Sequence, residues 1–173
     1  MDPFQLLGLG RRFDLDLSVV EKTHRELSRA LHPDRYAQAG ASERRAALEK
    51  AASVNEAWRT VRDPITRAEA LFRVHGVAVG ETHEPKPTPA FLMEVLEERE
   101  ALSEARASKD LTKVRAIGAA MEARKQAIEN KLADGFETAT DVVAITKLVP
   151  HLGELRFYKR FLDEVSAIEE ENE

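Results

Sequence analysis

The sequence contains no cysteine. This absence excludes disulfide bonds, cysteine nucleophiles, and zinc or iron–sulfur sites built on the chain's own thiolates. The histidines are few and scattered, at positions 24, 32, 75, 83 and 151, and none forms an HExxH pair or another close ligand spacing. We therefore expect no metal site and no cofactor.

Long apolar runs and an excess of positive charge are also missing. No run of about 18 apolar residues is present that could cross a membrane. The N-terminus, MDPFQLLGLG, has no basic region ahead of its short apolar stretch, unlike a signal peptide. We expect a cytoplasmic protein without a membrane partner. The 26 basic and 31 acidic side chains give a net charge of −5, so we expect no nucleic-acid partner.

Helical periodicity dominates what is present. Alanine, leucine, glutamate, lysine and arginine recur every three or four residues, and β-branched residues never alternate as they would in a strand. We predict an all-α fold whose helices cover residues 3–7, 18–31, 42–62, 64–75, 89–108, 110–133 and 138–169.

Local signals predict the ends of several helices. Ser18 and Glu21 have the spacing of a capping box at the start of the second helix. Ser42 is placed to cap the third helix. Asp63 is placed to cap the fourth helix, which begins at Pro64.

The last two helices contain further breakers. Asp134-Gly135 predicts the end of the helix that starts at residue 110. Pro150 and Gly153 lie inside the last helix, where we expect a kink or a short break.

The composition changes at GETHEPKPTP, residues 80–89, which holds three of the seven prolines and no large apolar side chain. Such a stretch is typical of a linker between domains. Three long helices with short turns follow it, which favours an antiparallel bundle. We predict a helical domain over residues 1–76, a linker over 77–87 and a three-helix bundle over 88–173.

The second helix has a buried face and a basic face. At 100° per residue, four side chains fall within about 60° of one another and predict the buried face: Val20, His24, Leu27 and Leu31. Lys22, Arg25 and Arg29 fall almost opposite. A solvated surface is the ordinary explanation of such a basic stripe. His24 is interpreted as a histidine at the edge of the core rather than a ligand.

The basic stripe leads directly to His32-Pro33-Asp34-Arg35. Pro33 ends the helix because it disfavours helical geometry at the residue before it. Turn chemistry alone can explain an aspartate after a proline. A catalytic His–Asp pair is an alternative, but neighbouring turn positions seldom let an aspartate orient the imidazole, and no nucleophile is marked nearby. A nucleic-acid-binding helix is disfavoured by the net acidity and the lack of a second basic element.

The helix over residues 89–108 has too many apolar residues for one stripe. Phe91, Val95, Leu102 and Ala105 lie on one side and predict the face toward the bundle core. A mixed apolar and acidic set lies on nearly the opposite side, with Leu92 between the two groups: Met93, Leu96, Glu97, Glu100 and Glu104. An apolar patch rimmed by carboxylates suggests a surface for a partner. The alternative is that Met93 and Leu96 pack against the first domain or the other helices.

Several segments together resemble a known family. PFQLLGL, the basic helix, HPDR and SVNEAWRTVRDPITRAEALF resemble a J-domain. The stretch AFLMEVLEEREAL closely resembles the C-terminal domain of HscB-type J-proteins, the dedicated co-chaperones of iron–sulfur cluster assembly. The resemblance covers essentially the whole chain, from Pro3 into the last helix, and FLMExLExRE is its more specific part.

The resemblance implies a J-domain joined to a three-helix bundle, with no catalytic centre and hence no enzyme. It implies that a DnaK- or HscA-type chaperone docks on the first domain and that its ATPase is stimulated there, at Lys22, Arg25, Arg29, His32, Pro33, Asp34 and Arg35. It implies that the scaffold IscU binds the second domain, at Leu92, Met93, Leu96, Glu97, Glu100 and Glu104.

Relatives add an aromatic scaffold contact in a segment that corresponds here to residues 147–150. This sequence has Val149-Pro150 in that segment, and its aromatic residues Phe157 and Tyr158 come only later. The alternative to the whole assignment is a general J-protein that serves other clients through the same bundle.

Overall fold

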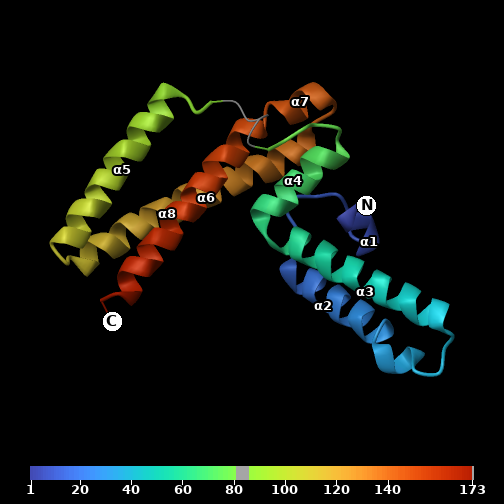
Figure 1. Cartoon of the computed structure of the whole chain (residues 1–173). Coiled ribbons are helices and arrows are strands. Elements are labelled where there is room, and N and C mark those ends of the chain that lie inside the picture. The colour runs from blue at the N-terminus through green and yellow to red at the C-terminus, as the bar shows by residue number, and fades with distance from the viewer. Residues whose placement is uncertain (81–85, 173) are drawn as a thin grey trace. The chain divides into compact units, whose positions relative to one another are not determined.

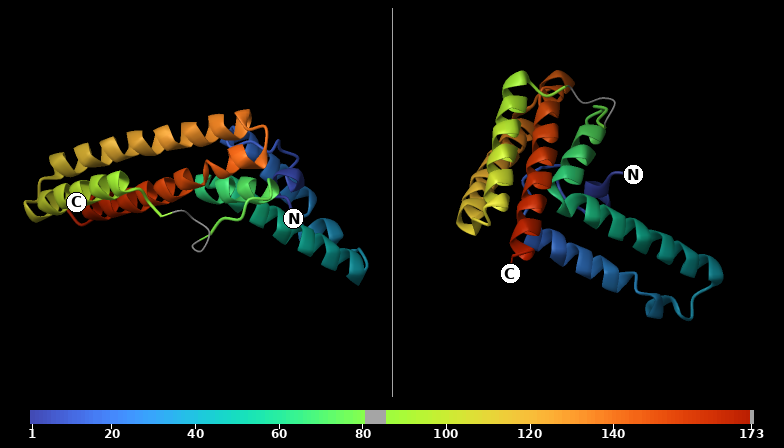
Figure 2. Two further views of the ribbon diagram at one scale, coloured as in Figure 1. Left: turned by 90° about the horizontal axis from the view of Figure 1, so that it is seen from above. Right: turned by 60° about the vertical axis from the view of Figure 1, so that its left-hand side comes forward.

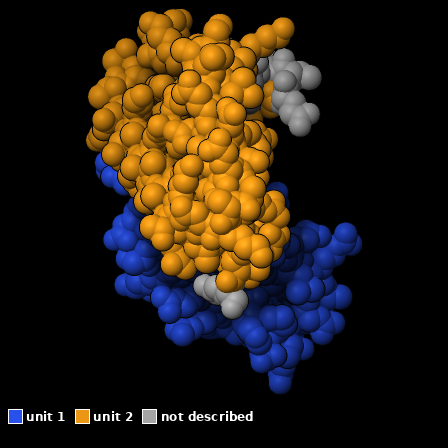
Figure 3. All heavy atoms as spheres, turned by 90° about the vertical axis from the view of Figure 1, so that its left-hand side faces the viewer, with its two compact units in different colours: residues 1–77 blue, residues 78–173 orange. Residues whose placement is uncertain are grey.

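The computed structural model describes residues 1–80 and 86–172. These residues form helices and connecting turns without any strand, so the all-α prediction is confirmed (Figure 1). The chain divides into two compact units, residues 1–77 and residues 78–173 (Figure 3). None of the helices in the described ranges is long and apolar enough to cross a membrane.

The first unit is built on a hairpin of two helices that pack side by side (Figures 1 and 2). Its elements are α1 (Pro3–Leu6), α2 (Leu17–Ala30), the 3₁₀ helix η1 (Pro33–Tyr36), α3 (Ala41–Arg62) and α4 (Pro64–Val74). Three of these elements besides α2 pack on α3, namely α1, η1 and α4. The core contains Phe4, Val20, Val54, Val61 and Leu71, all almost completely buried.

Two of the predicted caps are wrong. Helix α2 begins one residue earlier than expected, and the Asp16 carboxylate accepts the Ser18 amide at 2.8 Å. Aspartate competes well with serine at an N-cap because its charge also interacts favourably with the helix dipole. Helix α3 begins at Ala41 with Gly40 as N-cap and no side-chain bond, so Ser42 lies inside the helix.

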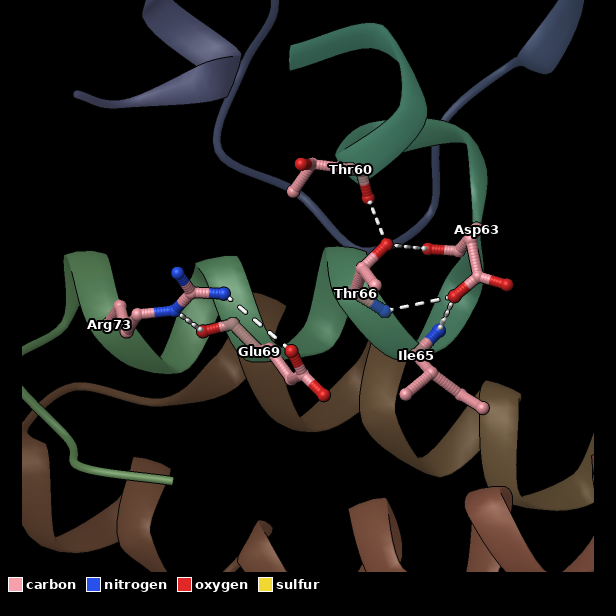
Figure 4. A network of polar contacts seen from close by, with 6 residues as sticks. All are labelled: Thr60, Asp63, Ile65, Thr66, Glu69 and Arg73. Carbon is pink, nitrogen blue, oxygen red and sulfur yellow. Dashed lines mark hydrogen bonds and ion pairs between the residues drawn. The ribbon is translucent and has the colours of Figure 1, made fainter. Parts of the chain in front are cut away.

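The corner between α3 and α4 agrees with the sequence prediction (Figure 4). Asp63 Oδ1 accepts the amides of Ile65 and Thr66, both at 3.0 Å. The Thr66 hydroxyl donates to the carbonyl of Thr60 at 2.8 Å. These bonds satisfy donors at the start of α4 and tie it to the end of α3, so a single residue, Asp63, separates the two helices.

The second unit contains three long helices and one short helix. They are α5 (Pro89–Ala107), α6 (Leu111–Thr138), α7 (Val142–Thr146) and α8 (Val149–Glu170). Helices α5 and α8 run in the same direction and α6 runs opposite to both (Figures 1 and 2). Leu102, Met121, Leu132, Leu152 and Phe161 are almost completely buried in this unit.

Two helix boundaries in the second unit differ from the prediction. Helix α6 continues through Gly135 to Thr138, because this glycine serves close packing: a Cβ there would collide with the side chain of Leu148. The expected break in the last helix falls before Pro150, which lies in the first turn of α8, where a missing amide donor costs nothing. Gly153 lies within α8 and ends no helix.

Candidate functional site

The basic stripe of α2 is exposed. Lys22, Arg25 and Arg29 face solvent, as does Arg35 in η1. None of the four forms an ion pair with a carboxylate in the part of the chain that the structure describes, and Arg25 Nε instead donates to the carbonyl of Glu21 at 3.4 Å. The positive charge of this stripe is therefore available to a partner.

His24 lies at the junction of α2 and α3, on the edge of the core. Its ring stacks on Trp58 with the ring centroids 4.5 Å apart and an interplanar angle of 14°. Its Nε2 lies 2.8 Å from Asn55 Oδ1. The guanidinium of Arg62 lies 5.2 Å from the centroid of the Trp58 ring and 3.5 Å from Glu21. These contacts fix α2 against α3 and so hold the basic stripe in place.

The His32-Pro33-Asp34 turn joins α2 to η1. His32 is extended, with φ −61° and ψ 135°, as the following proline requires, and Pro33 opens η1. The Nδ1 atom of His32 accepts a hydrogen bond from the Asp34 amide at 3.3 Å and lies 3.4 Å from Asp34 Oδ2. The two side chains remain 59% and 89% exposed. The turn is thus held locally while both functional groups stay open to solvent.

This geometry does not favour the alternative of a catalytic pair. In a catalytic triad the aspartate accepts the Nδ1 proton of the histidine and thereby orients the opposite nitrogen toward a nucleophile. Here Nδ1 of His32 accepts a backbone amide instead. In residues 1–80 and 86–172, no group of three or more histidine, aspartate or glutamate side chains is arranged to hold a metal ion.

The outer face of α5 carries exposed apolar side chains. Leu92 is 47% exposed, Met93 59% and Leu96 62%. On the inner face Phe91 packs edge-on against the ring of Phe157, with the centroids 5.5 Å apart. The helix therefore has the two faces expected from its sequence, and Met93 and Leu96 do not pack into the bundle core.

The carboxylates of α5 fall into two groups. Glu94 and Glu98 both bind Arg124 of α6, at 2.7 and 2.9 Å. Glu97 and Glu100 are exposed and form no ion pair within the described ranges. The third predicted site carboxylate, Glu104, is exposed and lies 3.4 Å from Lys113 Nζ. The unpaired charge thus coincides with the exposed apolar residues.

The aromatic residues of α8 belong to the bundle core. Phe157 and Tyr158 are 8% and 6% exposed and both contact the Phe91 ring. Burial, followed by the negative charge of Glu94, raises the pKa of the Tyr158 hydroxyl. In the segment over residues 147–150, Val149 is buried and its neighbours offer no aromatic ring.

Polar contacts that the sequence did not predict join α5 to α8. The guanidinium of Arg99 donates to Glu164 at 3.3 Å and lies 5.9 Å from the centroid of the Phe157 ring. Arg106 donates to both carboxylate oxygens of Glu171, at 3.1 and 2.8 Å. Both pairs are separated by 65 residues, so the periodicity within one helix carries no signal for them.

Comparisons with known proteins cover nearly the whole chain. Residues 87–166 match the family model described as the HSCB C-terminal oligomerisation domain. The chain is 36% identical over 168 residues to a co-chaperone protein HscB homolog of Bordetella avium, covering 97% of this chain and 97% of the relative. It is 33% identical over 164 residues to the homolog of Burkholderia multivorans, covering 95% of this chain and 91% of that relative.

Solved structures are similar over the same extent. The chaperone HscB from Vibrio cholerae has 28% sequence identity and a TM-score of 0.85, covering 99% of each chain. Human co-chaperone protein HscB has a TM-score of 0.84 and covers 96% of this chain and 81% of its own. Its identity of 22% supports the fold alone.

Proposed function

The chain belongs to the HscB family of co-chaperones, and on that premise we propose that it binds an IscU-type iron–sulfur scaffold and delivers it to a DnaK- or HscA-type chaperone. It stimulates the ATPase of that chaperone and so promotes cluster transfer to iron–sulfur proteins. Its relatives are named co-chaperones, and we assign this chain no catalytic residues of its own. The proposed compartment is the cytoplasm, where both partners would have to meet it.

We assign the two activities to separate parts of the chain. Residues 1–76 form the J-domain, residues 77–87 the linker, and residues 88–173 the scaffold-binding domain. The chaperone site consists of the basic stripe and the turn: Lys22, Arg25, Arg29, His32, Pro33, Asp34 and Arg35. The scaffold site consists of the outer face of α5: Leu92, Met93, Leu96, Glu97, Glu100 and Glu104.

Exposure and charge support the chaperone site. An unpaired positive stripe attracts an acidic partner and speeds association. A turn that Pro33 and the Asp34 amide already hold loses little conformational entropy on docking. The bound J-domain would then stabilise the conformation of the chaperone that hydrolyses ATP, which is a binding effect with a kinetic consequence.

Tethering supports the delivery step. A scaffold held on one domain and a chaperone held on the other are brought to a high effective concentration for each other. The chain would not hold the cluster itself, because it has no cysteine ligands. Cluster transfer would follow from the ATPase cycle of the chaperone.

The observation that carries the proposal is the exposure of Met93 and Leu96 beside unpaired carboxylates. The full chain, immobilised and offered a mixture of the scaffold and denatured model proteins, should capture the scaffold selectively. Capture of assorted unfolded chains instead would point to a general J-protein. Turnover by the isolated chain, with no chaperone present, would contradict the assignment as a co-chaperone.

A further inference from the structure

Within the outer face of α5, the two leucines of the proposed scaffold site lie along the edge next to α8. Leu92, Leu96 and Arg99 recur every three or four residues and therefore form one stripe along the helix. At the end of this stripe, Arg99 donates to Glu164 of α8 at 3.3 Å. The contact identifies α8 as the neighbour of the leucine stripe.

The carboxylates lie on the other side of the same face. Met93, Glu97, Glu100 and Glu104 form a second stripe with the same spacing. Glu104 lies 3.4 Å from Lys113 of α6, so this stripe runs along the α6 side. The face is thus polarised across its width, with leucines toward α8 and carboxylates toward α6.

Arg160 of α8 adds positive charge beside the leucines. Helices α5 and α8 run in the same direction (Figures 1 and 2), and two contacts fix their register: Phe91 to Phe157 and Arg99 to Glu164. Arg160 lies three residues after Phe157 and four before Glu164, hence on the face of α8 that these two residues share. The same register sets it level with the stretch of α5 between Leu92 and Leu96.

The charge of Arg160 is not compensated. The side chain is exposed and has no ion pair with any carboxylate in residues 1–80 or 86–172. Its cationic neighbours differ, since Arg99 binds Glu164 and Lys159 binds Asp163 at 3.0 Å. Across the exposed face, the order is therefore carboxylates, apolar side chains and one free guanidinium.

We infer that Arg160 is a specificity-determining residue of the scaffold-binding face and pairs with a carboxylate of the scaffold. The complementary surface of the scaffold presents basic groups opposite Glu97 and Glu100, an apolar centre opposite Met93 and Leu96, and an acidic group opposite Arg160. A guanidinium suits this role because it can bind a carboxylate through two hydrogen bonds. The inference rests on the proposed function.

The test compares Arg160→Glu, Arg160→Gln and a matched control, Lys159→Glu, in the full chain. Lys159 lies two residues after Phe157, on the side of α8 turned away from α5, and its replacement changes the net charge equally. Calorimetric titration with the apo scaffold at 50 mM salt should show Kd raised about threefold by Arg160→Gln and about tenfold by Arg160→Glu. Lys159→Glu should leave Kd within about twofold of the wild type.

Repeating the titrations at 0.5 M salt should bring the three variants within about twofold of one another, because rim charges are then screened. Equal increases of Kd in Arg160→Glu and Lys159→Glu would overturn the inference. Losses of affinity in the Arg160 variants that do not depend on salt would overturn it as well. Thermal melting of each variant establishes that it is folded. A wild-type chain that does not bind the scaffold overturns the proposed function, and the inference with it.

Discussion

Pro33 and the amide of Asp34 fix the conformation of His32 without burying its ring. The same turn packs through η1 against α3. A substitution at His32 should therefore change what the surface offers to a partner while leaving the core intact.

We predict that His32→Gln abolishes stimulation of the partner ATPase. The melting temperature should stay within about 2 °C of the wild type, because exposed substitutions usually change stability by about 0.5 kcal/mol or less. The measurement is steady-state ATP hydrolysis by the chaperone against increasing co-chaperone. His151→Gln in α8 makes the same chemical change in the other unit and should stimulate normally. Undiminished stimulation by His32→Gln would refute the J-domain mechanism.

A second residue-scale effect concerns the first turn of the chain. Asp2 accepts the amides of Phe4 and Gln5 and pairs with Arg11 Nε at 2.7 Å. Burial acts to raise the pKa of Asp2, but the bonds from Arg11 and the two amides outweigh it, so this pKa lies below the ordinary value of 3.8. The ionised carboxylate therefore stabilises the fold at pH above 3.8, and this contribution is lost as the pH falls through the lower, folded-state pKa.

We predict that Asp2→Ala lowers the free energy of unfolding by about 1 kcal/mol at pH 7, the usual effect of losing an N-cap. The difference from the wild type should shrink as the pH falls below 4, because protonation removes the same interactions from the wild-type protein. Urea unfolding at pH 7 and at pH 3.5 or below measures the difference. If Asp2→Ala lowered the free energy of unfolding equally at both pH values, the charge on Asp2 would contribute nothing to stability.

At the scale of the element, α5 shows how one helix serves both a core and a surface. Phe91 packs against the α8 rings while Leu96 is 62% exposed. Both faces of the helix carry large apolar side chains. Its orientation is also fixed by ion pairs along its two edges, to Arg124 of α6 and to Glu164 of α8.

We predict that Met93→Ala combined with Leu96→Ala weakens scaffold binding at least tenfold, because exposed apolar side chains at the centre of an interface carry much of its affinity. The melting temperature should change little. The control is Leu102→Ala on the buried face, which should cost about 2–5 kcal/mol of stability. If the double variant melts early and its affinity falls in proportion, the patch is part of the core.

Features that lie within one helix could be predicted from the sequence, whereas features that depend on distant residues could not. Helix periodicity correctly separated the exposed and buried faces of α2 and α5, since that signal lies within a single helix. The cap at Asp16 was missed because Asp16 and Ser18 are both good caps two residues apart. Asp134-Gly135 has the local pattern of a helix end, but the role of Gly135 depends on Leu148, which is distant in sequence and lies between α7 and α8. The contact of Arg99 with Glu164 also joins residues that are distant in sequence, so the sequence did not predict it.

At the scale of the whole molecule, charge is divided between the two units. Residues 1–77 contain 13 basic and 11 acidic side chains, whereas residues 78–173 contain 13 basic and 20 acidic ones. The net charge of −5 hides this asymmetry. Net charges of opposite sign on the two units suit two partners of opposite surface charge, as the proposed function requires.

We predict that raising the salt concentration from 50 to 300 mM increases several-fold the co-chaperone concentration that gives half-maximal ATPase stimulation. Replacing Lys22, Arg25 and Arg29 together by glutamine should weaken stimulation at low salt and flatten this dependence. The assay is the same ATP hydrolysis titration at both salt concentrations. A salt dependence that survives the triple replacement would mean that other charges attract the chaperone.

The stacking of Trp58 on His24 gives the molecule a built-in spectroscopic probe. The chain has a single tryptophan, and it lies in the first unit, at the junction of the helix that carries the basic stripe with α3. Its fluorescence therefore reports on the folding of the first unit alone, whereas circular dichroism reports on the helices of both. Unfolding curves from the two methods that do not coincide would show that the units unfold independently.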